Sequence, residues 1–439
     1  MVDEKLIMLS DEKLWSDNIQ KSINKGISPL KLGPFTDGEI RAVLLRYIER
    51  GEYHVAPPHI ALIPKENGKI RKVFVNMPLD RLILGCINDV YYKLYSDRIH
   101  PKCLSYQKGV SVHNIIQKLI NQNRLGCQAD ESIGYKVDIH AYFDSVKREE
   151  VNKALLELNT DSALDKILWE YYNTDIVINE DDQVIKHYKS LAQGCAFGTF
   201  LANYVLRDVD EEVGNMVPVY YRYSDDILIM GSNKEAALEK LINMLEKKGL
   251  ELNPKKIEKI YPNRWFTFLG FRICGDRVSF SEKSLKTLCK EIEELTLKVG
   301  KQKRCGCTKE EVKSAVKKIN NKLFYSYEQN HKVFGWAEYF FRTINVVEDI
   351  ETIDFWIRDC LRAMYTGHLK VGGLGVDNGK AQKRRGISRG IGKNVTANKI
   401  KTGEQFLKEC GYLSIRHLYK LYRIDKDLYK AYLRKEVYG

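Results

Sequence analysis

The stretch VYYRYSDDILIM, from Val219 to Met230, decides the fold. Bulky β-branched and aromatic residues flank its centre on both sides and predict two buried strands joined by a tight turn. Two adjacent carboxylates, Asp225 and Asp226, lie at that turn. An adjacent pair alone is common in surface turns, but like charges in an apolar setting raise each other's pKa unless a positive partner joins them. The stretch therefore predicts a hairpin whose tip binds a cation.

A third carboxylate can join this pair. The stretch GYKVDIHAYFDSV, from Gly134 to Val146, predicts a strand that runs into a turn, with Asp138 at the end of its apolar part. A strand and a hairpin lying side by side would bring Asp138 to Asp225 and Asp226. Carboxylates are hard oxygen ligands, which favour Mg²⁺ or Mn²⁺ over zinc. Two such ions about 4 Å apart suit in-line phosphoryl transfer.

The composition narrows the class of partner. Lys and Arg total 71 against 58 Asp and Glu, which gives a formal net charge of +13 and a pI near 9.0. This excess favours a polyanion, either nucleic acid or an anionic membrane surface. No apolar run approaches the ~20 residues of a membrane span. The charged opening MVDEKLIMLSDEKLW does not resemble a signal peptide. We therefore expect nucleic acid, and no membrane, as the partner.

The ten cysteines follow no disulfide framework, so we expect a reducing, cytoplasmic location. The closest pair is Cys305 and Cys307, in the sequence CGC. Zinc at this pair would need two more ligands, and the neighbouring sequence offers none. An exposed loop is therefore favoured over a zinc site.

Hydrophobic periodicity predicts helices and strands in alternation along the chain. Residues up to about Tyr53 have helical spacing, and HIALIPKENGKIRKVFV predicts a strand, a turn and a second strand. Residues 147–176 are predicted to be helical, and WFTFLGFRI is predicted to be a further strand. The pattern is mostly helical over 281–365. A stretch rich in glycine and basic residues, 367–401, precedes two more helical stretches.

The motifs, in their order, resemble those of reverse transcriptases. YSDD at Tyr223–Asp226 is similar to the family's Y-x-D-D motif. DIHAYFDSV resembles the first aspartate motif, in the version shared by group II intron, retron and related bacterial enzymes. The other matching stretches are LIPKENGKIRKVFV for the fingers hairpin, SYQKGVSVHNII for the template side, QGCAFGTFLANYVL for the glycine-bearing motif, GLELNPKK for the lysine motif and FTFLGFRI for the primer grip. The resemblance covers about Ala56 to Ile273.

The resemblance implies an α+β fold of the right-hand polymerase type. Fingers and palm, built on an antiparallel palm sheet plus helices, would be followed by a helical thumb and a basic C-terminal extension. The expected boundaries are 1–55 for an N-terminal helical segment, 56–275 for the fingers and palm, 276–365 for the thumb, and 366–439 for an RNA-binding extension.

The resemblance also implies roles for the matching residues near the aspartates. The expected metal ligands are Asp138 and Asp225, with Asp226 as the auxiliary carboxylate and the backbone carbonyl of Ile139 completing one metal. Lys256 occupies the lysine position of its motif and is expected to donate a proton to pyrophosphate. Lys255 lies one place earlier and leaves that assignment open.

Other matching positions surround the incoming nucleotide. Lys65 and Arg71 lie on the fingers hairpin, and Arg71 is expected to grip the triphosphate; the alternative is a solvated basic face. Gln193 and Gly194 would border the nascent base pair, since a side chain at Gly194 would intrude on it; the alternative is a helix-capping turn. Tyr223 is expected to contact the substrate, with a core aromatic as the alternative.

Phe143 is expected to decide the choice of sugar. It lies five residues after Asp138, where the family places an aromatic steric gate. A ring there would collide with a ribose 2′-OH, so deoxynucleotides are favoured. Polymerases of the palm type that make RNA usually have an aspartate at that position, whereas here Asp144 falls one place later. Tyr142 is the second candidate for the gate.

The implied activity is that of an RNA-directed DNA polymerase, a nucleotidyltransferase that uses dNTPs and two Mg²⁺ or Mn²⁺ ions. The variant Q-G-x-x-x-G, the compact length and the short thumb resemble the bacterial "unknown group" enzymes of antiphage defence. Within them, class 2 enzymes copy a companion non-coding RNA into cDNA. The alternatives are a retron-type enzyme that makes RNA-linked single-stranded DNA, and a non-catalytic RNA-binding protein on the polymerase fold. The sequence predicts no oligomeric state.

The basic stretch near the C-terminus is the expected place to hold a structured RNA. Its glycines allow close approach of the backbone, and its cationic clusters supply phosphate contacts. The residues expected to make these contacts are Lys383, Arg384, Arg385 and Arg389. The alternative is a solvated linker.

Overall fold

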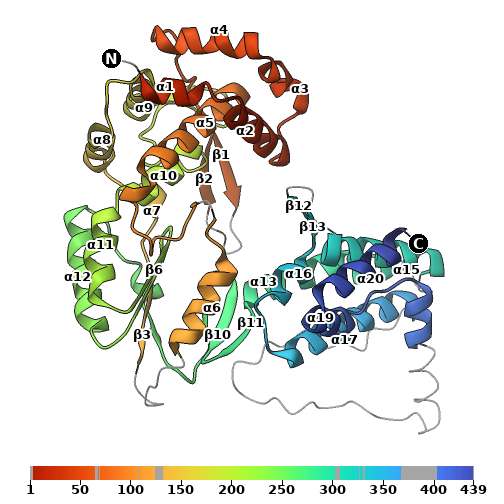
Figure 1. The fold of residues 1–439 in the computed structure, drawn as a ribbon. Helices are drawn as coiled ribbons and strands as arrows, with labels where there is room; N and C mark the ends of the chain where they lie inside the picture. The colour runs from red at the N-terminus through yellow and green to blue at the C-terminus, as the bar shows by residue number, and fades with distance from the viewer. Residues whose placement is uncertain are drawn as a thin grey trace, which may run out of the picture. The chain divides into compact units, whose positions relative to one another are not determined.

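The computed structural model describes residues 3–64, 68, 70–107, 109–123, 132–301, 307–325, 327–329, 332–366 and 403–438. The chain divides into two compact units, whose elements are labelled in Figure 1. The first contains Met1–Val110 and Asp130–Tyr261, and the second contains Ser111–Ala129 and Pro262–Gly439. The four segments expected from the sequence stay a prediction, because these units do not separate fingers, palm and thumb.

Helices open the first unit, as the sequence predicts up to about Tyr53. Aspartates cap three of them, because the side chains of Asp3, Asp11 and Asp37 each accept a hydrogen bond from a backbone N–H of the first turn. Gly51, at φ +71°, follows the end of the last helix, a conformation that glycine adopts without strain. The elements are α1 (Glu4–Leu9), α2 (Glu12–Asn24), α3 (Pro29–Leu32), the 3₁₀ helix η1 (Gly33–Thr36) and α4 (Gly38–Glu49).

A four-stranded sheet contains the predicted hairpin of HIALIPKENGKIRKVFV. Its strands β1 (His59–Pro64) and β2 (Ile70–Val75) pair antiparallel. Two strands that the sequence did not predict, β4 (Ile176–Ile178) and β5 (Val184–Lys186), extend the sheet in the order β2-β1-β4-β5. A strand of three residues is too short for its periodicity to be recognised.

The stretch predicted as one helical run over 147–176 forms two helices. They are α8 (Arg148–Glu157) and α9 (Ala163–Asn173). Ser162 and Asp165 form a capping box that starts α9. The Ser162 side chain accepts a hydrogen bond from a backbone N–H of the first turn, and the Asp165 side chain accepts one from the backbone N–H of Ser162. The prediction was right in type and missed this break.

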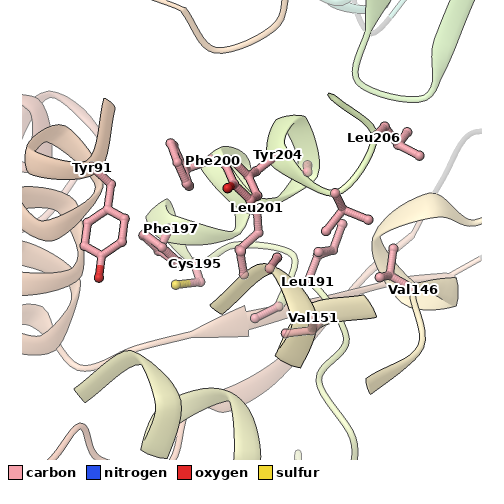
Figure 2. Close-up of a cluster of buried hydrophobic side chains, with 14 of the residues drawn as sticks. Tyr91, Val146, Val151, Leu191, Cys195, Phe197, Phe200, Leu201, Tyr204 and Leu206 are labelled. Carbon is pink, nitrogen blue, oxygen red and sulfur yellow. The ribbon is translucent and has the colours of Figure 1, made fainter. Parts of the chain in front are cut away.

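Aromatic packing joins α5 (Pro78–Tyr95) to α10 (Ala196–Tyr204) in the core of the first unit (Figure 2). The rings of Tyr91 and Phe197 meet edge to face, with 4.9 Å between centroids. Phe200 contacts the rings of both Tyr91 and Tyr204. Such pairs add about 0.5–1.5 kcal/mol beyond the burial of their area. This packing fixes α10, the helical part of the glycine-bearing motif.

The palm sheet is antiparallel, as predicted, with the strand order β6-β7-β3-β8. The quoted stretch forms the hairpin of β6 (Val219–Tyr223) and β7 (Asp226–Met230), and β3 (Gly134–Asp138) pairs with β7. Helices α11 (Arg207–Met216) and α12 (Lys234–Lys247) pack against the sheet. The unit is completed by η2 (Ser96–Arg98), α7 (Tyr142–Ser145), η3 (Pro254–Lys256) and β8 (Glu258–Ile260).

The second unit is mostly helical, as the sequence predicts for 281–365. It also contains a three-stranded sheet in the order β11-β10-β9. The stretch WFTFLGFRI, predicted as one strand, forms two, because Leu269 and Gly270 turn the chain at φ values of 51° and 84°. The strands are β9 (Phe266–Phe268), β10 (Phe271–Cys274), β11 (Arg277–Phe280), β12 (Tyr327–Gln329) and β13 (Lys332–Phe334). The helices are α6 (Val112–Asn123), α13 (Glu282–Leu295), α14 (Leu297–Lys301), α15 (Lys309–Asn320), the π-helix η4 (Asn321–Tyr325), α16 (Trp336–Phe341), α17 (Val347–Thr366), residues 403–409, α19 (Ile415–Ile424) and α20 (Lys426–Tyr438).

Helix α6 belongs to the second unit although it lies far from the rest of that unit in the sequence. His113 is its anchor: its Nδ1 lies 2.6 Å from the hydroxyl of Thr343. The His113 ring also packs against the rings of Phe271 and Tyr339. Burial, with the nearby cation of Arg342, lowers the pKa of His113 to about 4.

Cys307 departs from the expected exposed loop. Its side chain is buried, and its backbone N–H donates to the carbonyl of Met364. Cys305 lies outside the described residues, so the zinc alternative for the pair stays open. Among the described cysteines, free thiols are found at Cys86, Cys103, Cys195, Cys274, Cys289, Cys360 and Cys410. No helix within the described ranges is long and apolar enough to cross a bilayer.

The low pKa of His113 predicts acid sensitivity of the second unit. The unfolded chain takes up a proton near the ordinary pKa of 6.5, whereas the folded state resists it down to about 4. Stability from the neutral ring is therefore present above pH 6.5 and is lost as the pH falls toward 4. In His113→Gln, the free energy of unfolding should fall less between these pH values, as measured by urea denaturation. His417→Gln, on the exposed face of α19, is the matched control; equal pH dependence in His113→Gln and wild type would contradict the prediction.

Candidate active site

The three aspartates of the sequence motifs meet at one end of the palm sheet. Asp138, the last residue of β3, lies opposite Asp226, the first residue of β7. Asp225 lies in the turn just before, and its carbonyl accepts a hydrogen bond from the N–H of Ile139 at 2.9 Å. Ser224 closes the turn at φ 60°, a left-handed conformation that is uncommon outside glycine. Strand register alone therefore brings the three carboxylates together.

These carboxylates are partly or fully withdrawn from solvent. Asp138 is 6% exposed, and Asp225 and Asp226 are half-buried. The pKa values of Asp225 and Asp226 are raised, first by burial and then by the charges of the neighbouring aspartates. Lys256 opposes this effect at both residues, and Lys136 on β3 opposes it at Asp226. The site therefore has an excess of negative charge that two lysines partly offset.

Lys256 is the direct positive partner. Its Nζ lies 2.5 Å from Oδ2 of Asp138. The short helix η3 positions it, because Asn253 donates its N–H to the carbonyl of Asp138 at 2.8 Å and accepts at its side chain from Lys255 N–H. The geometry thus brings Lys256, and not the exposed Lys255, to the aspartates. Its role as a proton donor stays a prediction.

A buried ion pair that the sequence analysis missed supports the turn from below. Nε and Nη2 of Arg222 donate to the carboxylate of Asp210 at 2.7 and 2.6 Å, and neither side chain has exposed surface. Tyr220 also donates to Asp210, at 2.7 Å. Nη1 of Arg222 donates to the carbonyl of Ser224 at 3.2 Å, directly before Asp225. The pair therefore fixes the backbone on which Asp225 depends.

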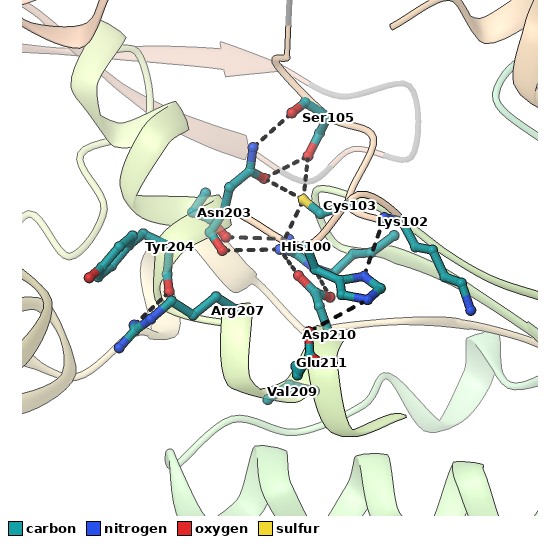
Figure 3. Close-up of polar contacts among 12 residues, drawn as sticks. His100, Lys102, Cys103, Ser105, Asn203, Tyr204, Arg207, Val209, Asp210 and Glu211 are labelled. Atoms are coloured by element: carbon teal, nitrogen blue, oxygen red, sulfur yellow. Dashed lines mark hydrogen bonds and ion pairs between the residues drawn. The ribbon is translucent and has the colours of Figure 1, made fainter. Parts of the chain in front are cut away.

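The same guanidinium ends helix α10. Its nitrogens donate to the carbonyls of Ala202 and Asn203 at 3.3 and 3.2 Å. Carbonyls in the last turn of a helix lack a partner within the helix, so these bonds satisfy them. Nη2 also contacts Sγ of Cys103 at 3.1 Å. Figure 3 shows how Asn203 continues the network to Cys103 and Ser105. The sequence offered one indication of this pair: Arg222 lies inside an apolar strand, and a buried arginine requires a buried acid nearby.

The donor set suits a hard divalent cation. Asp138 and Asp225 supply carboxylate oxygens, and Ile139 supplies a backbone carbonyl at the same end of the sheet. These are ligands that Mg²⁺ and Mn²⁺ prefer. In the part of the chain that the structure describes, no three His, Cys, Asp or Glu side chains form a ready group around a metal position. The chemistry and position of these residues fit such an ion. Lys256 lies beside them, and its charge acts on Asp138, Asp225 and Asp226.

The glycine-bearing motif lies against the fingers hairpin. The carbonyl of Gln193 accepts from the N–H of Phe74 on β2 at 2.7 Å. Gly194 has φ +108°, and a Cβ there would come within 2.6 Å of the Phe74 carbonyl. The glycine is thus required by the strand beside it, a reason other than the nascent base pair expected from the sequence. Arg71 is exposed on the same strand, whereas Lys65 lies outside the described residues.

The two aromatic residues after Asp138 lie in different surroundings. Phe143 is half-buried, and its carbonyl accepts from the N–H of Leu191, next to the glycine-bearing motif. Tyr142 is 2% exposed, and its hydroxyl donates to the carbonyl of Ala202 at 2.6 Å. This burial does not suit the predicted contact of Tyr142 with a nucleotide, because the ring has no free surface. We therefore keep Tyr142 as a core residue and Phe143 as the candidate gate.

Tyr223 has a neighbour that the sequence analysis did not single out. It is half-buried, and its ring lies 6.3 Å from that of Tyr106. The hydroxyl of Tyr106 donates to Oγ of Ser224 at 3.3 Å, and Tyr106 itself has φ 59°. The SYQKG motif contained this residue, but no pattern in the sequence indicated its partner. The basic residues Lys383, Arg384, Arg385 and Arg389 lie outside the described residues.

Comparison with known proteins agrees with this site. Residues 63–273 match the family of reverse transcriptases (RNA-dependent DNA polymerases). The matched range contains the three aspartates, Lys256, the four strands of the palm sheet and β2 of the fingers hairpin. This part of the chain is a reverse transcriptase domain, and its fold is of the right-hand polymerase type, as the sequence predicted. A domain of this kind supports the activity of an RNA-directed DNA polymerase.

Two individual proteins are similar to the chain. Protein YkfC of Escherichia coli (strain K12) is 24% identical over 271 residues, which cover 53% of this chain and 70% of YkfC. The solved structure of telomerase from Candida albicans, in complex with a TWJ fragment of telomeric RNA, is 12% identical with a TM-score of 0.39. That similarity covers 74% of this chain and 63% of the telomerase chain, so the chain spans less than two thirds of it.

The Arg222–Asp210 pair predicts a large effect on stability. Arg222→Met leaves the carboxylate of Asp210 buried without its cation, which should lower the free energy of unfolding by about 3–5 kcal/mol. Adding Asp210→Leu removes the stranded charge and should recover part of this loss. Urea denaturation measures both. The control is Lys240→Met, which breaks the solvent-exposed pair between Lys240 on α12 and Glu212 on α11. An effect of Arg222→Met no larger than that of the control would contradict the prediction.

Proposed function

We propose that the chain is an RNA-directed DNA polymerase that synthesises cDNA from a companion non-coding RNA and serves in antiphage defence. The observation that carries the polymerase part is the register of β3 and β7, which sets Asp138 opposite Asp226 with Asp225 beside them. The family match over 63–273 supports the same reaction. The choice of template and the defence role rest on the sequence motifs alone.

The carboxylates have a defined part in this proposal. Asp138, Asp225 and the carbonyl of Ile139 would hold the divalent ions, with Asp226 as the auxiliary ligand. When bound, Mg²⁺ or Mn²⁺ supplies Lewis acidity and neutralises charge at the reacting phosphates. The raised pKa values of Asp225 and Asp226 favour this assignment, because carboxylates crowded in a buried site gain most from added positive charge.

Cationic side chains act on the triphosphate in this scheme. Arg71, exposed on β2, would donate to the phosphate oxygens of the incoming nucleotide. Lys256 carries the ammonium nearest the carboxylates and would give a proton to the departing pyrophosphate. Gln193 and Gly194, fixed against β2, would border the base pair that forms. The hairpin and the glycine-bearing motif would then position the nucleotide as one assembly.

Template and environment complete the proposal. The cationic residues Lys383, Arg384, Arg385 and Arg389 would contact phosphates of the companion RNA. The scattered spacing of the cysteines, which follows no disulfide framework, favours a cytoplasmic location. A retron-type enzyme remains the alternative function, and the nucleic acid that co-purifies with the chain distinguishes the two: a retron product is single-stranded DNA joined to RNA.

Replacing both hairpin aspartates tests the polymerase. Asp225→Asn with Asp226→Asn should reduce Mg²⁺-dependent primer extension on an RNA template by about a thousand-fold or more, because several kcal/mol of transition-state stabilisation is lost. The fold should persist, since the change also removes charge repulsion.

The chain offers a matched control for this test. Asp181 and Asp182 form a second adjacent pair, exposed in the turn between β4 and β5. Changing both to Asn removes the same charge and should leave extension near the wild-type rate. If the Asp225/Asp226 and Asp181/Asp182 double variants extend primers at equal rates, the proposed site is wrong. If the wild-type chain is inactive as well, a non-catalytic RNA-binding protein is favoured.

Phe143 tests the proposed choice of sugar. Phe143→Val removes the ring that would collide with a 2′-OH, so the preference for dNTPs over rNTPs should fall by about ten-fold or more. Competition between the two nucleotides in primer extension measures this preference. The neighbouring variant Tyr142→Phe loses only a buried hydroxyl and should leave the preference unchanged. An unchanged preference in Phe143→Val would place the gate elsewhere.

A further inference from the structure

The contact between Lys256 and Asp138 joins two side chains of very different exposure. Their charged atoms are 2.5 Å apart, while 56% of the Lys256 side chain and only 9% of the Asp138 side chain are exposed. The lysine therefore reaches from solvent to a carboxylate that is otherwise enclosed. An ammonium at this distance would compete with a metal ion for the same carboxylate.

The surroundings explain why a cation is held there. Three carboxylates meet at this end of the sheet, and among the described residues the cations whose charges act on Asp225 and Asp226 are Lys256 and, at Asp226, Lys136. Arg222 is close in sequence, but both of its terminal nitrogens are engaged by Asp210 and backbone carbonyls. The guanidinium is therefore not available to Asp225. Lys256 is thus the cation that faces Asp138 directly.

The side chain of Lys256 can leave without moving the backbone. The N–H of Lys256 donates to the carbonyl of Asn253 at 2.9 Å, and Asn253 is itself bonded to the carbonyl of Asp138. The backbone of η3 is thus fixed to β3. The four-carbon stem beyond it is largely in solvent, where rotamers change freely.

We propose that Lys256 is a built-in counter-ion that competes with the divalent ion for Asp138 and so sets the affinity of the site for metal. One carboxylate oxygen does not contact an ammonium and a metal ion in the same place, so binding the ion displaces the lysine. The displaced ammonium becomes free for the phosphates of the substrate. This inference rests on the proposed function, because it takes the aspartates as metal ligands.

Direct metal binding tests the inference without any catalytic assay. Mn²⁺ is titrated against the full chain in the absence of nucleotide and nucleic acid, and free Mn²⁺ is measured by electron paramagnetic resonance. Lys256→Met keeps the length of the side chain and removes the charge. Its Mn²⁺ dissociation constant should be about two- to five-fold lower than that of wild type, the range expected for loss of one partly exposed competing charge. Lys256→Arg, which keeps the charge, should not bind more tightly than wild type.

The neighbouring lysine provides the matched control. Lys255→Met removes the same charge one residue away and should change the dissociation constant little. An equal gain in both variants would mean that net charge, and not the Asp138 contact, sets the affinity, which overturns the inference. Equal or weaker binding in Lys256→Met, in protein shown by circular dichroism to be folded, overturns it as well.

Thermal unfolding gives a second and independent measurement. In EDTA, Lys256→Met should have a lower melting temperature than wild type, because Asp138 loses its counter-ion. Saturating Mn²⁺ should remove this difference, since the metal ion replaces the ammonium; a difference that persists overturns the inference.

The variant Asp225→Asn with Asp226→Asn separates the two proposals. If wild-type binding of Mn²⁺ does not depend on these aspartates, the proposed function fails, and this inference fails with it. If binding depends on them but is the same in Lys256→Met and wild type, only the inference fails.

Discussion

The buried pair of Arg222 and Asp210 is the constraint on which the first unit depends. A guanidinium without exposed surface has to satisfy its donors internally, and here they join strand β6, helix α11, the end of α10 and the turn before Asp225. Four elements are thereby fixed to one planar group. The cost of removing both charges from water is offset only in this one arrangement. Specificity of structure, more than added stability, is what such a pair contributes.

The sequence was sufficient where local patterns determine the structure. The β-branched and aromatic residues that flank Asp225 and the apolar residues before Asp138 indicated strands, and a strand beside the hairpin was expected to bring the carboxylates together. Proximity of the aspartates was therefore predictable from short stretches. The glycine after α4 and the aspartate caps also act through their own neighbours, whereas the antiparallel palm sheet was expected from the resemblance to reverse transcriptases.

Features that depend on distant partners were not predictable. Asp210 as the partner of Arg222, and Ala202 as the acceptor for Tyr142, are separated from them in sequence, and no spacing rule selects them. Backbone strain was equally hidden, because Ala192 and Ser224 adopt left-handed conformations that their residue types disfavour. These positions flank the glycine-bearing motif and the aspartate turn. The surrounding structure imposes the strain, so a single sequence carries little trace of it.

Helix α6 has a consequence for how the chain is made. On the ribosome it is synthesised long before its anchor, since Thr343 follows His113 by 230 residues. At a translation rate of ~5–20 residues per second, this delay is roughly ten to fifty seconds. Throughout it, the helix that carries Ile116 and Leu119, both fully buried in the finished protein, lacks the residue to which His113 is anchored. The second unit therefore cannot mature from either end of the chain alone, and its folding has to wait for the completion of translation past residue 343.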